Sequence, residues 1–177
     1  DSPRDLEDWF PGRWSPKRTI QAESAFLAHA AALALEGSGW WRRGSGVAVD
    51  GGLVIGTDLA SLEPALRFRR SLESGVRGEM VPSDFLFSLP SSPASMLGIL
   101  FGLVDCQTTV THHGLSGFKA LSFGLDLVRA RRQRRVLVGA LSALGPNGIE
   151  FLRREGEPLG SEAAPFAMAA ALCLEAI

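Results

Sequence analysis

Cysteine is scarce in this chain, which has only two in 177 residues. Cys106 and Cys173 lie too far apart in the sequence for a zinc knuckle or a redox C-x-x-C pair, because both motifs need close spacings. Both cysteines lie in apolar, strand-like segments, where a free thiol behaves as a small hydrophobic group. We therefore expect two buried thiols in a protein of a reducing compartment.

The sequence also lacks signs of a targeting signal or a membrane span. It does not open with a charged segment followed by an apolar one, as a signal peptide would. Charged or polar residues interrupt the small-residue-rich segments before they could span a bilayer. The net charge is −1, so no overall field attracts nucleic acid or an anionic membrane. We expect a soluble, cytoplasmic protein whose partners are neither nucleic acids nor membranes.

Motifs for nucleotides and metals are missing as well. No G-x-G-x-x-G and no P-loop accompanies the glycines near Gly52. His112 and His113 are adjacent, and neighbouring residues of a strand point to opposite faces, so they cannot easily share a metal ion. His29 lies far away in the sequence. We expect no metal and no cofactor, and we assign the two histidines to hydrogen bonds at a strand end or an interface.

Lysine is almost absent: only two of the 18 Lys and Arg residues are lysine. Five arginines fall between Arg129 and Arg135. Such a run is typical of a solvated helix end, where the negative pole of the helix dipole favours cations. Contact with an acidic carrier-protein surface is the alternative interpretation.

Apolar periodicity predicts helices that alternate with buried strands. Helices are predicted over 15–37, 61–72, 94–103 and 115–132, strands over 52–57, 108–111, 136–141 and 166–174, loops over 73–82 and 150–164, and a turn at 145–148. Ser15 and Pro16 supply an N-cap and a first helical residue, and Gly37 ends that helix. The pattern predicts an irregular lead-in over 1–12 and one layered α/β domain over 13–177, with a central, mostly parallel or mixed sheet.

The segment from Cys106 to Leu121 combines a β-prone strand, a sharp turn at His112-His113-Gly114 and a long helix. It resembles the strand–turn–helix unit of the β-ketoacyl synthases of the thiolase superfamily, in which the turn holds the nucleophilic cysteine. Further segments resemble the family in the same order: 54–57, 85–90, 95–103, 136–140 and 170–175. The resemblance covers 13–177 and implies the N-terminal half of a thiolase-like α/β fold.

Three departures from the family set the expected function. Gly114 stands at the position of the cysteine, and a glycine offers no sulfur to attack an acyl thioester. The family's catalytic histidines come from a second half that this sequence does not contain. The usual first strand is not evident before Trp14. The resemblance therefore implies a chain that performs no condensation and exposes a face or sheet edge that a complete synthase covers.

The resemblance implies a non-catalytic subunit, similar to the chain-length factors that pair with an active ketosynthase in fatty-acid, polyketide or polyene-type biosynthesis. The partner would be that ketosynthase in a heterodimer, or a second copy in a homodimer, and acyl carrier protein would take part only indirectly. Family members dimerise through the strand before the turn, which here is Cys106, Gln107, Thr108, Thr109, Val110 and Thr111. Reasonable acyl-tunnel wall residues are Phe85, Phe87, Met96 and Phe118, although core packing explains them equally well.

Two other functions stay open. The stretch from Gly114 to Phe118 approximates the G-x-S-x-G elbow of hydrolases, but Phe118 stands where the second glycine is needed. An acyl-thioester hydrolase would use His113 and Ser116, whereas a serine in a first helical turn more often satisfies backbone donors. The chain could also be a structural homodimer without activity.

Overall fold

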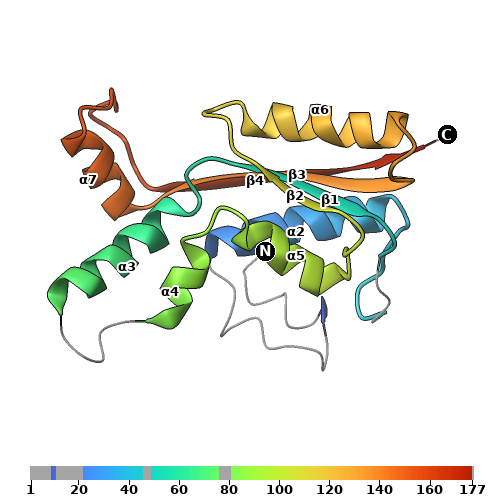
Figure 1. Ribbon diagram of the computed structural model, residues 1–177, viewed down its shortest axis with the longest axis horizontal. Helices are drawn as coiled ribbons and strands as arrows, with labels where there is room; N and C mark the ends of the chain where they lie inside the picture. The colour runs from blue at the N-terminus through green and yellow to red at the C-terminus, as the bar shows by residue number, and fades with distance from the viewer. Residues whose placement is uncertain (1–8, 11–21, 46–48, 76–80, 177) are drawn as a thin grey trace.

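The structure, a computed structural model, describes residues 9–10, 22–45, 49–75 and 81–176. A sheet forms the middle layer, with a long helix above it and further helices below it (Figure 1). Three further helices lie together beyond one end of the sheet (Figure 1). The region before Trp14, where no first strand is evident from the sequence, lies almost entirely outside the described residues.

The sheet confirms the expected mixed architecture. Its strands are β1 (Gly52–Thr57), β2 (Gln107–Val110), β3 (Arg135–Leu144) and β4 (Phe166–Glu175). Their order is β2-β1-β3-β4, with β1 parallel to both neighbours and β4 antiparallel to β3. Every residue of β1 is buried, because a parallel strand between two others is covered on both faces, and this explains its uninterrupted apolar run. In β4 exposed and half-buried residues alternate, as in a strand with one open face.

Below the sheet lie α2 (Ala22–Gly37) and α5 (Ser92–Phe101). The predicted end of the first helix at Gly37 is confirmed, while its predicted start at Ser15 and Pro16 lies outside the described residues. The alanines of α2 let it pack closely on the sheet: a Cβ atom at Gly139 of β3 would lie 3.1 Å from the Leu27 side chain.

Two aromatic residues of the expected lead-in belong to the core. Trp9 is buried and meets His29 of α2 edge-on, with ring centroids 4.7 Å apart. Phe10 packs against Trp41 and Phe101 at centroid distances of 5.5 Å and 5.3 Å. The aromatic pair therefore closes the lower layer, although its polar sequence neighbours suggest an irregular segment.

Beyond the end of the sheet lie α3 (Leu62–Ser74), α4 (Pro82–Phe87) and α7 (Pro146–Arg154). The predicted turn at 145–148 is wrong, and the predicted loop over 150–164 is wrong for its first five residues, because α7 begins at Pro146 and continues to Arg154. Ile149 is buried while the charged residues of the helix are exposed, so the segment's polar composition concealed an amphipathic helix.

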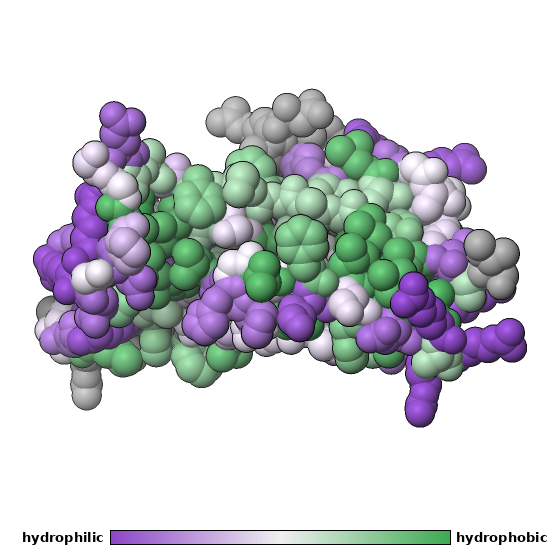
Figure 2. Space-filling view, turned by 90° about the horizontal axis from the view of Figure 1, so that it is seen from above, coloured by the Kyte–Doolittle hydropathy of each residue, from purple (hydrophilic) through white to green (hydrophobic). Residues whose placement is uncertain are grey.

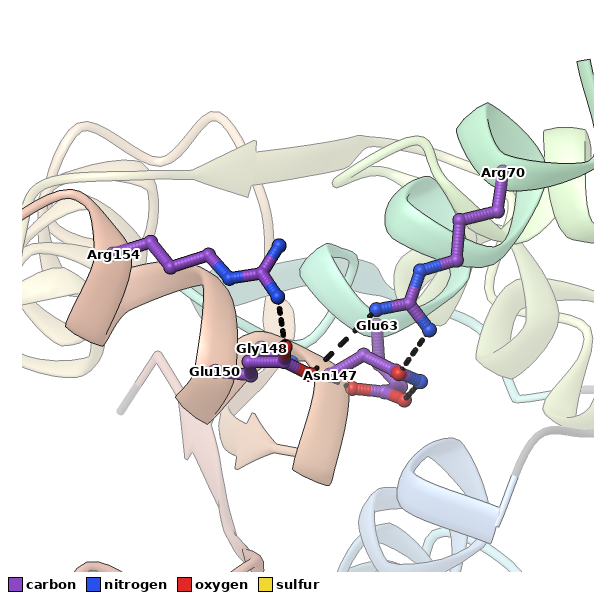
Figure 3. A network of polar contacts seen from close by, with 6 residues as sticks. All are labelled: Glu63, Arg70, Asn147, Gly148, Glu150 and Arg154. Carbon is purple, nitrogen blue, oxygen red and sulfur yellow. Dashed lines mark hydrogen bonds and ion pairs between the residues drawn. The ribbon is translucent and has the colours of Figure 1, made fainter. Parts of the chain in front are cut away.

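A polar network joins α3 to the start of α7 (Figure 3). The buried Glu63 carboxylate accepts a hydrogen bond from the Gly148 backbone N–H at 3.0 Å and a second one from the Asn147 side-chain amide. Arg70 donates to the Asn147 side-chain oxygen. Glu63 thus supplies, from another helix, the acceptor that the first turn of α7 needs.

Above the sheet lies α6 (Ser116–Arg129). Phe118, Leu121, Leu125 and Val128 are on the predicted apolar face, yet the residues buried against the sheet are Ser116, Ala120 and Gly124. The helix approaches too closely for larger residues, since a Cβ atom at Gly124 would lie 2.5 Å from the Val138 side chain. Phe118 remains 74% exposed.

The arginine run begins in the last turn of α6 and continues to the start of β3. Arg129, Arg131 and Arg132 are exposed, as expected for a solvated helix end. Arg135 instead donates to Glu175 at 2.9 Å, and this hydrogen bond holds the pKa of the Glu175 carboxyl below its usual value.

Both cysteines are half-buried rather than fully buried. Cys106 precedes β2, and Cys173 lies in β4 with its thiol 3.4 Å from the Ala34 carbonyl. Burial raises the pKa of the Cys173 thiol. Within the described residues, no helix is long and apolar enough to cross a bilayer.

Candidate functional site

The turn between β2 and α6 holds Gly114, the position at which the sequence resemblance places a nucleophile. His113 has a φ of 30° and Gly114 a φ of 20°, so the backbone passes through a conformation that side-chain-bearing residues seldom adopt. The Leu115 N–H donates to the carbonyls of His112 and His113 and closes the turn. A Cβ atom at Gly114 would meet nothing within 4 Å, so the turn presents open space where a side chain could project.

Ser116 and Asp58 hold this turn against the end of β1. Ser116 is 2% exposed, and its hydroxyl donates to the Asp58 carboxylate. The same hydroxyl accepts the His112 backbone N–H at 2.6 Å, and Asp58 accepts that N–H at 3.3 Å. The hydroxyl therefore satisfies a backbone donor, in line with the structural interpretation of Ser116.

Close backbone contact fixes the start of α6 on the sheet. A Cβ atom at Gly56 of β1 would run into the Ser116 carbonyl and come within 2.7 Å of the Gly117 nitrogen. A Cβ atom at Gly117 would lie 2.9 Å from that of Ala140 on β3. These two glycines allow helix and strand to touch, and they position the turn that precedes the helix.

An apolar groove of about 590 Å³ runs beside α6 over β3 and β4. One end reaches Gly114 and Asp58, while Phe118 and Leu121 line its α6 side. Its floor and far side are formed by residues 138–142 of β3 and 168–172 of β4. Seen from above, apolar side chains cover much of this face (Figure 2). The upper face thus carries one helix and leaves the β4 side open.

The strand that the resemblance implies as a partner interface is an edge strand of the sheet. The carbonyl of Cys106, just before β2, accepts the Leu53 N–H at 2.7 Å. Backbone groups of successive strand residues point to alternate sides, so Thr108 and Val110 face β1. Gln107 and Thr109 direct their N–H and C=O groups away from the sheet, and Thr111 follows the strand.

The two histidines of the turn are exposed and do not form a reactive pair with Ser116. Among the hydrogen bonds of the described residues, none joins Ser116 to His113. No group of three or more His, Cys, Asp or Glu side chains within residues 9–10, 22–45, 49–75 and 81–176 is placed to hold a metal ion. His29 lies in α2 and directs Nδ1 to the Ala25 carbonyl at 2.9 Å.

The four residues considered for an acyl-tunnel wall lie in different parts of the fold. Met96 of α5 is buried in the core below the sheet. Phe85 of α4 packs against Phe68 at a centroid distance of 5.4 Å, and Phe87 lies on the same short helix. Phe118 alone among the four lines the groove above the sheet. All four are apolar, but Phe118 lies above the sheet, Met96 lies below it, and Phe85 and Phe87 lie on α4.

Comparison with solved structures identifies this architecture. A ketosynthase in complex with its chain length factor from Xenorhabdus doucetiae aligns with a TM-score of 0.66 and 19% identity, over 93% of this chain and 62% of the matched chain. A β-ketoacyl synthase from Burkholderia phymatum aligns with a TM-score of 0.70 and 21% identity, over 95% of this chain and 46% of the matched chain. The ishigamide ketosynthase/chain length factor aligns with a TM-score of 0.65 and 21% identity, over 93% of this chain and 48% of the matched chain.

The chain has a thiolase-like ketosynthase fold. It spans about half to three fifths of the chains that it matches. No protein-family model and no curated protein sequence matches it. Within the ketosynthase fold, the strand–turn–helix unit that suggested the resemblance is β2, the Gly114 turn and α6.

Sequence reasoning found the Gly114 turn and the structural role of Ser116, but it missed two carboxylates: Asp58, which supports this turn, and Glu63, which supports the start of α7. Asp58 directly follows the buried strand β1, and the carboxyl ends of parallel strands meet at one edge of a sheet. Its position in the sequence could therefore have predicted that it lies near the turn after β2. Glu63 left no such signal, because its partners Asn147 and Gly148 lie in a helix that the composition concealed.

Proposed function

We propose that the chain is a non-catalytic, ketosynthase-like subunit of the chain-length-factor type. It pairs with an active ketosynthase and influences the length of acyl chains made in fatty-acid, polyketide or polyene-type biosynthesis. The observation that carries the proposal is Gly114, which occupies the turn between β2 and α6 and provides no nucleophile. Two of the similar structures, which are named as ketosynthases with chain length factors, agree with it.

The edge strand β2 is the proposed contact with the ketosynthase. Its outward N–H and C=O groups at Gln107 and Thr109 are available to a partner strand. Ile99 of α5 and Val104, on the segment that leads into β2, are large apolar residues with exposed fractions of 69% and 72%. An edge with free backbone groups and apolar side chains nearby suits a protein partner.

Replacing Thr109 by proline should abolish co-purification of this chain with its proposed partner ketosynthase. Proline removes the outward N–H of Thr109 while leaving the hydrogen bonds of Thr108 and Val110 to β1, which an edge strand tolerates. The two proteins are co-expressed with a tag on one of them, and the ratio of the purified chains is measured. Thr109→Ala, which keeps the N–H, is the matched control and should co-purify like the wild type.

Unchanged binding of Thr109→Pro would show that β2 is not the contact. Failure of the wild-type pair to co-purify, together with unchanged product length, would reject the subunit proposal itself. Circular dichroism of both variants establishes that the fold is intact.

Replacing Ser116 by alanine separates the proposal from acyl-thioester hydrolysis. We expect no thioesterase activity on acyl-pantetheine substrates in the wild type, so the Ser116→Ala variant should show no loss of activity. The variant should instead lose about 1–3 kcal/mol of unfolding free energy, because the His112 N–H and the Asp58 carboxylate lose a buried partner. Hydrolysis by the wild type that disappears in Ser116→Ala would favour the hydrolase.

A further inference from the structure

The dipeptide Asn147-Gly148 lies in the first turn of α7, and Asn147 is the only asparagine in the sequence. An asparagine followed by glycine is prone to deamidation, because glycine has no Cβ atom to shield its backbone nitrogen or to restrict its rotation. In that reaction the glycine nitrogen attacks the asparagine side chain, and a succinimide ring forms. The dipeptide is thus a chemically reactive pair that the proposed function does not use.

Packing between α3 and α7 favours the glycine of this pair. Gly148 is buried, and a Cβ atom there would lie 2.7 Å from the Leu144 side chain and 3.3 Å from that of Leu62. A larger residue would crowd both leucines. The reactive pair therefore belongs to the contact between the two helices, and any protection has to come from the groups around it.

The Glu63 carboxylate binds both reacting groups (Figure 3). One of its oxygens accepts the Gly148 N–H at 3.0 Å, and the other accepts the Asn147 side-chain amide. Arg70 donates to the side-chain oxygen of Asn147, so the nitrogen and the oxygen of that amide are both engaged. Glu63 itself is only 8% exposed, which keeps these hydrogen bonds away from competing water.

The helical backbone adds a second restraint. In a helix ψ is about −42°, and ring closure requires the ψ of Asn147 to turn well away from that value. Such a rotation swings the Gly148 N–H away from Glu63 and breaks the hydrogen bond between them. The reaction therefore needs the first turn of α7 to open.

We propose that Asn147-Gly148 is a self-modification site that Glu63 keeps unreactive in the folded chain. When the turn opens, a bond forms between the Gly148 nitrogen and Cγ of Asn147, and the bond from Cγ to Nδ2 breaks. Nδ2 leaves as ammonia and takes up the proton that the Gly148 nitrogen loses. Water then opens the ring to aspartate or isoaspartate, with no oxidant or reductant.

The products do not fit the contact that suppressed the reaction. Either one carries a carboxylate where Asn147 donated to Glu63, and two carboxylates at close range repel each other. Isoaspartate also lengthens the main chain by a methylene group inside the first turn of α7. The modified chain should therefore hold α3 and α7 together less firmly than the original chain.

The deamidation rate of the purified chain tests the proposal. The chain is incubated at neutral pH, and mass spectrometry follows the peptide that carries residue 147 and its isoaspartate form. Because opening is fast compared with the chemistry, the rate follows the population of the open turn. The folded wild type should react at least about tenfold more slowly than the same chain in urea. Glu63→Ala should react about tenfold faster than the folded wild type, because the turn loses a charged hydrogen-bond partner.

Ser116→Ala is the matched control, because it weakens the chain at α6 and leaves the Glu63 contacts in place. It should deamidate like the wild type. Circular dichroism shows which variants are folded. Glu63→Gln, which keeps the side-chain volume, provides the comparison if Glu63→Ala does not fold, and it should also react faster than the wild type.

A folded Glu63 variant that deamidates no faster than the wild type would overturn the proposal. A slower rate would show that the carboxylate promotes the attack instead. Equal acceleration in Ser116→Ala would assign the protection to global stability rather than to Glu63. None of these measurements involves a ketosynthase, so this proposal and the proposed function fail independently.

Discussion

Replacing Gly56 by valine should lower the unfolding free energy by roughly 3 kcal/mol, the upper part of the usual range for overpacking. Gly56 lies in the middle of the sheet, and a side chain there would run into the Ser116 carbonyl and the Gly117 nitrogen. Both obstacles are backbone atoms at the start of α6, so the helix itself has to move. The Ser116–Asp58 hydrogen bond that holds the Gly114 turn would be lost with that movement.

Urea unfolding followed by tryptophan fluorescence measures the effect, since Trp9 and Trp41 lie in the core. Gly160→Val is the matched control, because a Cβ atom at Gly160 meets nothing within 4 Å, and it should be nearly neutral. If Gly56→Val were as stable as the control, the close contact between β1 and α6 would be refuted.

Replacing Glu63 by alanine should cost about 3 kcal/mol of unfolding free energy, because a charged hydrogen-bond partner is removed from a buried site. The Gly148 N–H and the Asn147 amide would both lose their acceptor, and the first turn of α7 would lose a favourable anion (Figure 3). The contact between α3 and α7 would weaken, while the Gly114 turn, at the start of another helix, would keep its own support.

Glu63→Gln is the conservative variant for comparison, because it keeps the side-chain volume and one hydrogen-bond acceptor oxygen. It should cost about half as much, on the order of 1.5 kcal/mol. Glu150→Ala removes an exposed ion pair with Arg154 from the same network and should cost less than about 1 kcal/mol. Equal losses for Glu63→Ala and Glu150→Ala in urea unfolding would contradict the capping role of Glu63.

The strand segments were predictable where apolar runs are bounded by turn residues, but their order in the sheet was not. The run from Gly52 to Thr57 and the final run from Phe166 are strands, as predicted. The fold class followed from this alternation of strands and helices. α7 escaped prediction because an amphipathic nine-residue helix with few apolar residues has the composition of a loop.

The site was predictable at its turn and at Ser116, but not at Asp58. Gly114 was found because the local pattern of strand, turn and helix surrounds it. The face that α6 buries was assigned only in part. Leu121 and Val128 pack against the upper core cluster as expected, whereas Phe118 is exposed. The fully buried residues are the small Ser116, Ala120 and Gly124, because the helix lies close to the sheet. Asp58 and Ser116 are 58 residues apart in sequence, and only the tertiary fold brings them together.

The central claim is that this chain acts through a ketosynthase rather than by its own chemistry. Mass spectrometry of the acyl products made by the proposed partner ketosynthase, with carrier protein and malonyl extender, tests it most directly. The ketosynthase with this chain should release a defined product length, the ketosynthase without it should make little or a different product, and this chain without the ketosynthase should make none. Identical products with and without the chain, or condensation by the chain alone, would contradict the account.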